Sequence, residues 1–201
     1  LAVVALAMLA GSAVASTVGF GLGITVSPVL LFVLDPQTVV ILINLVGAAV
    51  FATILVRSLD HLELREMGPM AGAGLLGVPF GVLALSSVSA SALRIGIAAL
   101  ILVLAVVVAV NPISRLRASG AVAPPLGFVV GAMTASLGVG APLIVLFLLQ
   151  HGWPPQTMRA SLSLFNFLIM IAGVAGYGIA GLLTAERVAL LVVVAAPVAG
   201  G

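Results

Sequence analysis

The sequence predicts an all-α protein: a polytopic integral membrane helical bundle built from two tandem repeats. Three observations predict this fold class. Hydrophobic residues make up 63% of the 201 residues and charged residues only 6%, too few to cover the surface of a soluble domain. The charges separate apolar runs long enough for membrane helices, which need roughly 20 apolar residues. Similar glycine-rich segments also occur twice at one fixed offset, as expected for duplicated membrane domains.

The repeat is visible in the positions of its glycines and prolines. Gly19 and Gly138, Gly21 and Gly140, and Pro36 and Pro155 are pairs of residues 119 positions apart. We assign residues 1–112 to the first repeat, residues 113–119 to a cytoplasmic linker and residues 120–201 to the second repeat.

Breaks and caps define the helices of the first repeat. Gly19, Gly21 and Gly23 interrupt the first apolar run, since each glycine weakens a helix by roughly 1 kcal/mol relative to alanine. Asp35 is a good N-cap and Pro36 a good first residue for the next helix. We expect helices over residues 1–17, 22–34, 36–56, 67–85 and about 90–110.

The fourth of these helices, residues 67–85, is rich in glycine, and these glycines predict a face for close helix packing. The glycines concerned are Gly68, Gly72, Gly74, Gly77 and Gly81. A serine, Ser89 or Ser91, caps the helix that follows, which ends before Asn111-Pro112.

The second repeat follows the same order. We expect helices over residues 126–136, from the break at 138–142 to residue 149, and over residues 155–177, and Thr184 caps one more. Pro79 in the first repeat matches Pro197 in the second. Because the first repeat continues through a further helix after Pro79, we expect the matching final helix to be missing.

Arginine positions predict the orientation. The loops with Arg57 and Arg65, and with Arg115 and Arg117, are two crossings apart and therefore lie on one side, which we place in the cytoplasm. The arginines do not reveal whether each broken segment crosses the membrane once or folds back as a hairpin. A single crossing gives parallel repeats, and a hairpin gives inverted repeats.

Composition argues against several classes of function. The chain contains no cysteine, which removes thiolate and disulfide chemistry. The pI of about 10.5 accompanies a net charge of only +2 and seven scattered arginines, so nucleic-acid binding is not expected. We expect no metal, no cofactor and no catalytic residue, and Met8, Met133 and Met170 are isolated.

Matching breaks in both halves favour a transporter whose site lies where the repeats meet. A break inside lipid survives only where it is buried or lines a cavity, and the helix N-terminus that it exposes carries roughly +0.5 charge, which suits an anion. The candidate substrate-binding residues lie at the breaks or on polar helix faces: Ser16, Thr17, Gly19, Gly21, Gly23, Asn44, Ser136, Gly138, Gly140, Pro142, Arg159, Ser163 and Asn166.

Each candidate also has a structural interpretation. The glycines suit helix packing, the hydroxyls suit bonds within their own helices, and the two asparagines suit interhelical hydrogen bonds. Arg159 lies one turn inside its helix, where it is able to snorkel to the interface. Two roles suit Asp35, that of a proton carrier and that of the N-cap of the helix at residues 36–56. We favour the N-cap. His61 belongs to a balanced polar loop that we expect to be solvated.

The chain resembles the sulfite exporter TauE/SafE family, also described as the 4-toluene sulfonate uptake permeases. The resemblance rests on residues 16–23 with Pro28, on residues 138–145, and on Arg159-Ala160-Ser161. Where the family often has consecutive glycines, this chain has Phe20, Leu22 and Ala141. The resemblance implies a multi-pass carrier of small sulfur-containing anions in the bacterial inner membrane, commonly with about eight helices.

We therefore expect a secondary transporter of small anions, sulfite or organosulfonates, that works in the direction of export. Its partners are the anion and the lipid bilayer, and its oligomeric state stays open. No ATP-binding loop is present, so gradients supply the energy. The alternatives are a transporter of another solute class and an integral membrane enzyme, which needs an intramembrane acid–base pair.

Overall fold

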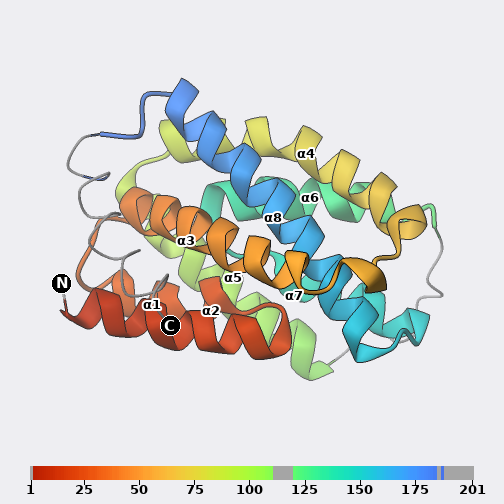
Figure 1. Cartoon of the computed structure of the whole chain (residues 1–201). Helices are drawn as coiled ribbons and strands as arrows, with labels where there is room; N and C mark the ends of the chain where they lie inside the picture. Colours follow the sequence, from red (N-terminus) through yellow and green to blue (C-terminus); the bar gives the residue numbers. More distant parts are fainter. Residues whose placement is uncertain (1, 111–119, 185–186, 188–201) are drawn as a thin grey trace.

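The computed structural model describes residues 2–110, 120–184 and 187, and this part of the chain is helical without strands. The all-α prediction is confirmed. The described part contains eight α-helices, which are labelled in Figure 1. They are α1 (Ala2–Val18), α2 (Leu22–Leu30), α3 (Pro36–Val56), α4 (Leu64–Ser87), α5 (Ala90–Val110), α6 (Ala123–Leu137), α7 (Ala141–Leu148) and α8 (Pro155–Ile179). Short 3-10 helices, η1 (Leu59–His61) and η3 (Leu149–His151), follow α3 and α7.

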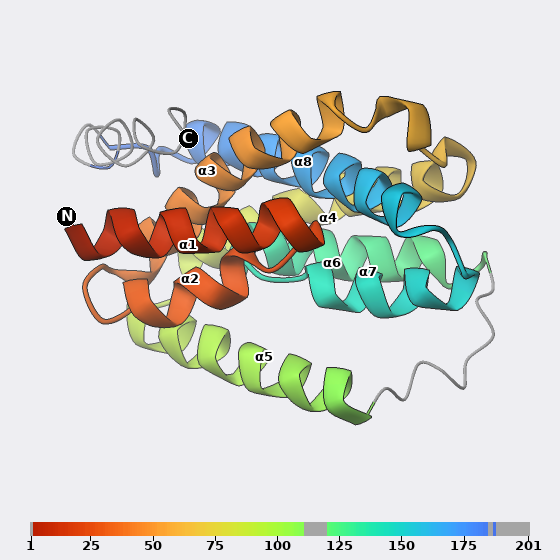
Figure 2. The same cartoon turned by 60° about the horizontal axis from the view of Figure 1, so that its bottom comes forward.

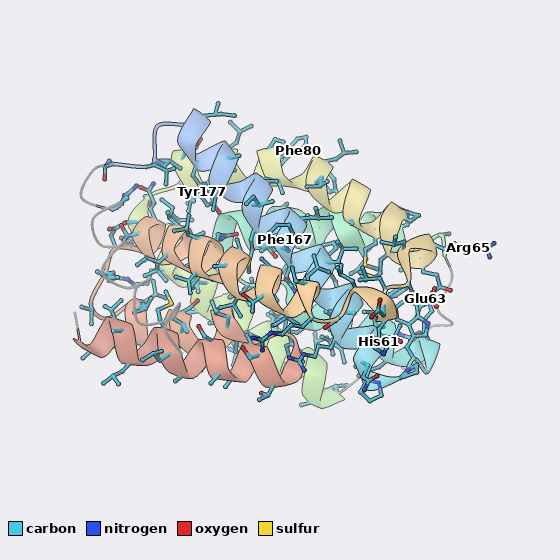
Figure 3. All side chains as sticks on the ribbon, viewed as in Figure 1. His61, Glu63, Arg65, Phe80, Phe167 and Tyr177 are labelled. Atoms are coloured by element: carbon cyan, nitrogen blue, oxygen red, sulfur yellow. The ribbon has the colours of Figure 1, made fainter. Side chains whose placement is uncertain are left out.

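Four helices are long and apolar enough to cross a membrane, namely α3, α4, α5 and α8. Helix α3 is the most enclosed of them, with 72% of its apolar window buried, whereas α5 lies on the outside with 17% buried. His61, Glu63 and Arg65 gather at one end of the bundle in Figure 3, and all three are exposed. This end, where α3 ends and α4 begins, is called the arginine end below.

The two broken segments fold back as hairpins. Within the first hairpin, α1 and α2, a Cβ on Gly11 of α1 would collide with Val26 of α2, and one on Gly21 would lie 3.4 Å from Val14. The earlier residue of α1 thus lies against the later residue of α2, and the later residue of α1 lies against the start of α2, as an antiparallel pair requires. In the second hairpin, α6 and α7 likewise lie side by side.

The hairpins approach from opposite ends of the bundle. In Figure 2 the first hairpin comes from the end that holds the N-terminus, the second comes from the arginine end, and their tips meet near the middle. Of the two arrangements that the sequence left open, the structure has hairpins, and the two halves run in opposite directions. That the halves arose as tandem repeats stays a prediction.

Helix α6 packs directly against α4 through glycine. Added Cβ atoms on Gly77 and Gly81 of α4 would collide with the carbonyl oxygens of Phe128 and Ala132 on α6, and one on Gly131 of α6 would collide with the Gly74 carbonyl. Gly68 and Gly72, in contrast, have no neighbour within 4 Å on this side of their backbone. The predicted packing face therefore contains Gly74, Gly77 and Gly81, and the prediction was wrong for the other two.

The helix starts follow the predicted caps. Asp35 accepts a hydrogen bond from the Thr38 N–H at 2.9 Å, which starts α3 at Pro36. Ser89 accepts from the Ala92 N–H at 3.4 Å at the start of α5. The N-cap role of Asp35 is therefore confirmed. The linker at 113–119 and the helix expected after Thr184 fall outside the described residues, apart from Arg187, whose N–H donates to Thr184 Oγ1 at 3.4 Å.

Candidate functional site

Both hairpins turn at a glycine with a left-handed backbone. Gly19 has φ 86° and Gly138 has φ 72°, a region that residues with a side chain rarely adopt. The Gly19 N–H donates to the Ala15 carbonyl at 2.8 Å, and the Gly138 N–H donates to the Thr134 carbonyl at 3.0 Å. These bonds end α1 and α6 in the manner of helix C-caps, so the pair of glycines at the 119-residue offset performs the same structural task twice.

The tips of the two hairpins touch. A Cβ on Gly23, in the first turn of α2, would collide with the Gly138 carbonyl oxygen of the second tip. Each tip also packs on a long helix of the other half. Gly19 lies against Arg159 of α8, with 3.1 Å between a built Cβ and the Arg159 Cγ, and Gly138 lies against Ile43 of α3 at 3.5 Å.

A small cavity lies where the tips meet. Its volume is about 20 Å³, counted as space for the centre of a water molecule, which is room for one or two waters. The residues around it are neutral and come from both hairpins, α3 and α8: Gly21, Leu22, Gly23, Ile24, Phe51, Thr134, Gly138, Val139, Gly140, Ala141, Asn166 and Met170. We call it the central cavity.

Two helices begin at the central cavity, α2 after Gly21 and α7 after Gly140. The first intrahelical bond of α2 runs from the Thr25 N–H to the Gly21 carbonyl at 3.0 Å, so the N–H groups of Leu22, Gly23 and Ile24 have no partner within their helix. Helix α7 offers fewer donors, because Pro142 has no N–H. Its Leu143 N–H donates to the Gly140 carbonyl at 3.2 Å.

Thr134 supplies a hydroxyl to the cavity that sequence reasoning missed. The residue is 1% exposed, and its Oγ1 has no hydrogen-bond partner among the described residues. Gly140 leaves space for this oxygen, since a Cβ there would lie 2.6 Å from Thr134 Oγ1. The available signal was its position one helical turn before Gly138. Thr134 has no hydroxyl counterpart in the first half, where Ala15 occupies the matching position.

Among the predicted residues, the central cavity brings together Gly21, Gly23, Gly138, Gly140 and Asn166. Asn166 is 1% exposed, and its Nδ2 donates to the Leu162 carbonyl at 2.9 Å. Pro142 is buried in the first turn of α7, and Gly19 lies at the first tip against Arg159. Neither contributes to the wall of the cavity.

Three of the four predicted hydroxyls bond to carbonyls of their own helices. Thr17 is exposed, and its Oγ1 donates to the Val14 carbonyl at 2.9 Å. Ser136 donates to the Ala132 carbonyl at 2.8 Å, and Ser163 donates to the Arg159 carbonyl at 2.8 Å. Ser16 is half-buried in the last turn of α1. None of the four belongs to the lining of the cavity.

Asn44 lies behind the second tip rather than in the cavity. Its Nδ2 donates to the Val40 carbonyl at 2.9 Å and to the Thr134 carbonyl at 3.2 Å. Tyr177 of α8 has a similar task, because its hydroxyl donates to the Ala135 carbonyl at 2.6 Å. Side chains of α3 and α8 therefore donate to two carbonyls in the last turn of α6, where intrahelical donors run out.

Arg159 lies between the arginine end and the central cavity. It is partly buried, and its Nε is enclosed without a partner in the described part of the chain. Seven residues separate it from Asn166 on α8, about 10 Å along the helix. The Arg159 side chain packs against Gly19 at the first tip, and the residue is not part of the wall of the cavity.

Two ion pairs lie near the ends of the bundle. His151 pairs with Glu66 of α4 through Nε2 and Oε2 at 3.1 Å, and Arg187 pairs with Asp35 through Nη2 and Oδ2 at 3.5 Å. Within residues 2–110, 120–184 and 187, no group of three or more potential metal-ligating side chains occurs.

The family model described as Sulfite exporter TauE/SafE matches residues 3–201. The chain belongs to the sulfite exporter TauE/SafE family. The resemblance inferred from the glycine motifs is thereby confirmed, and with it a multi-pass membrane protein of an exporter-type transporter family for sulfite and related sulfur anions. No curated protein and no solved structure gives a significant match.

Proposed function

We propose that this TauE/SafE member is a secondary transporter that exports small sulfur-containing anions, such as sulfite or organosulfonates, across the bacterial inner membrane. The observation that carries the proposal is the central cavity, where two helix N-termini from opposite hairpins meet a buried hydroxyl. Free N–H groups and the positive ends of helix dipoles favour an anion. Family membership narrows the anion to sulfur oxyanions at the level of chemical class.

Transport requires the tips to move. The cavity has room for one or two waters, and an ion with a sulfur and three oxygens is larger. A rocking motion that separates the first tip from the second therefore admits the anion from one side at a time, as in other carriers with inverted halves. The close contact between Gly23 and the Gly138 carbonyl is the contact that this motion breaks.

The membrane potential favours export. An inside-negative potential of 100 mV favours the exit of each negative charge by about 2.3 kcal/mol. The described spans carry no Asp or Glu in their interior, because Asp35 caps α3 and Glu66 lies in the first turn of α4. A carboxylate that binds a coupling cation is thus not seen in these spans, and an exporter needs none.

Flux in proteoliposomes tests the proposal. The purified chain is expected to carry labelled sulfite faster than protein-free liposomes, and an outward anion movement is expected to accelerate when the inside is made negative. Gly140→Val is expected to abolish flux, because its side chain meets Thr134 Oγ1 and the Val130 carbonyl. Gly72→Val is the matched control, since nothing lies within 4 Å of that position.

Three results would contradict the proposal or a part of it. Wild-type protein that carries sulfite no faster than empty liposomes would remove the function. Full flux in an inserted Gly140→Val protein would remove the central cavity as its site. Flux that ignores the potential but requires sodium or a proton gradient would reverse the assignment of direction.

A further inference from the structure

The central cavity is positively polarised by helix N-termini and not by a charged side chain. No lining residue is charged, and the polarisation comes from the first turns of α2 and α7. Each helix N-terminus is equivalent to roughly half a positive charge, so the two together balance about one negative charge.

Three carbonyls of the negative helix ends at the same tips are paired. The Thr134 carbonyl accepts from the Gly138 N–H at 3.0 Å and from Asn44 Nδ2 at 3.2 Å, and the Ala135 carbonyl accepts from the Tyr177 hydroxyl. At the first tip, the Ala15 carbonyl accepts from the Gly19 N–H at 2.8 Å. Donors therefore cover these three carbonyls, whereas the first N–H groups of α2, whose residues line the cavity, have no partner within their helix.

Arg159 does not supply a second contact charge. Arg159 packs against Gly19 at the first tip and does not line the cavity, and Coulomb attraction falls with distance. It attracts anions toward the tips, but it leaves a second negative charge in the cavity without a partner. A buried charge without a partner is costly.

Thr134 is an independent sign of a ligand. A buried hydroxyl that lacks a partner destabilises a fold unless another group pairs with it, and Thr134 Oγ1 is enclosed, unpaired and part of the cavity wall. An oxyanion oxygen in the cavity is the acceptor that this hydroxyl lacks.

We propose that the central cavity selects singly charged oxyanions over doubly charged ones and binds them through the Thr134 hydroxyl and the N–H groups of the α2 start. This inference rests on the proposed function and narrows it. For sulfite, the transported species is then hydrogensulfite, and sulfate is excluded by its charge.

Sulfite itself provides the test, because it changes from the monoanion to the dianion near neutral pH. Initial flux into proteoliposomes is measured at fixed total sulfite and equal pH on both sides, with the leak of protein-free liposomes subtracted. The flux is expected to follow the hydrogensulfite concentration, and so to fall about tenfold per pH unit once the dianion dominates. Excess sulfate is expected to leave the flux unchanged.

The pH dependence of the substrate is separated from any effect of the two histidines of the chain, His61 and His151, by a control variant. Both lie at the arginine end, and His151 faces Glu66 there. A double variant, His61→Gln with His151→Gln, is expected to keep the same pH profile. A profile that shifts in this variant, flux that follows the dianion, or sulfate inhibition as strong as that of unlabelled hydrogensulfite would overturn the inference. If no sulfite moves at all, the proposed function falls with it.

The hydroxyl is tested separately. Thr134→Val keeps the shape of the side chain and removes the donor, so the apparent affinity for hydrogensulfite is expected to fall about tenfold, while Thr134→Ser restores most of it. Ser161→Ala is the control, because Ser161 is also buried with an unpaired hydroxyl but lies outside the cavity wall. Equal affinities in the valine and wild-type proteins would remove Thr134 from the site.

Discussion

The tip of the second hairpin is held by individual side chains of other helices. Asn44 reaches it from α3 and Tyr177 from α8, and both donate to carbonyls in the last turn of α6. A buried carbonyl without a donor costs free energy, so these two residues stabilise the last turn of α6 next to the central cavity.

Removal of the Tyr177 hydroxyl is expected to destabilise the protein. Tyr177→Phe leaves the Ala135 carbonyl without this donor in a buried place and is expected to lower the free energy of unfolding by about 1–2 kcal/mol. Thermal unfolding in detergent measures the change. Thr53→Ala is the control, since the exposed Thr53 hydroxyl bonds only within its own helix, to the Ala49 carbonyl. Equal stability of the phenylalanine variant and the wild type would show that the hydrogen bond is not needed.

At the scale of residues, sequence reasoning located the glycines better than the polar side chains. Gly19 and Gly138 were predictable because a break repeated at one offset has a backbone cause. Thr17 and Ser136 flank the breaks just as well as Thr134 does, but their hydroxyls bond to carbonyls of their own helices. The direction in which a hydroxyl points depends on how its helix is rotated about its axis. The position of a residue next to a break in the sequence does not reveal this rotation.

At the scale of elements, α4 and α6 form the closest helix pair because their glycines let the backbones touch. Small residues at such an interface allow van der Waals packing that lipid does not replace. This contact joins the second hairpin to a spanning helix and fixes the side from which the tip of α6 approaches the cavity.

Two glycines of the same helix are expected to respond to alanine with opposite signs. Gly77→Ala places a methyl group against the Phe128 carbonyl and is expected to lower the free energy of unfolding by about 1–3 kcal/mol. Gly72→Ala meets open space and is expected to raise it by up to about 1 kcal/mol through helix propensity. Thermal unfolding of the two variants gives the order, and a reversed order would show that α4 and α6 do not touch at Gly77.

The spanning helices were predictable to within a few residues because apolar length and caps determine them. Helix α3 starts at Pro36 and ends at Val56 as expected, whereas α2 ends at Leu30, four residues before the expected end. Contacts between the two halves decide which glycines of α4 face a partner. They also decide whether the broken segments fold back. Local propensity does not encode those contacts.

At the scale of the whole molecule, the opposed hairpins place the two ends of each hairpin on one side of the membrane, and the two hairpins use opposite sides. The chain enters the first hairpin and leaves it at the end that holds the N-terminus, and it enters and leaves the second hairpin at the arginine end. A carrier with this plan has one moving part open to each side, which suits alternating access to one central site.

This topology predicts which positions are labelled together. The chain has no cysteine, so single cysteines can be introduced without background. Cysteines at Val3 and Phe32 are expected to react with an impermeant maleimide from one side of the membrane, and cysteines at Gly120 and Gly152 from the other. All four residues are exposed in the described structure. Because both members of each pair flank one hairpin, a single crossing would instead place them on opposite sides.

The arginine end supplies the absolute orientation. We expect its arginines to lie in the cytoplasm. A cysteine that replaces Glu63, in the loop before α4, is then labelled under the same conditions as the Gly120 and Gly152 cysteines. All three react only after the cytoplasmic face of the membrane has been made accessible. The cysteines at Val3 and Phe32 then react in intact cells. Labelling of Val3 and Gly120 from the same side would contradict opposed hairpins, because the tips would then approach from one direction and the two helix N-termini would no longer converge on a shared cavity.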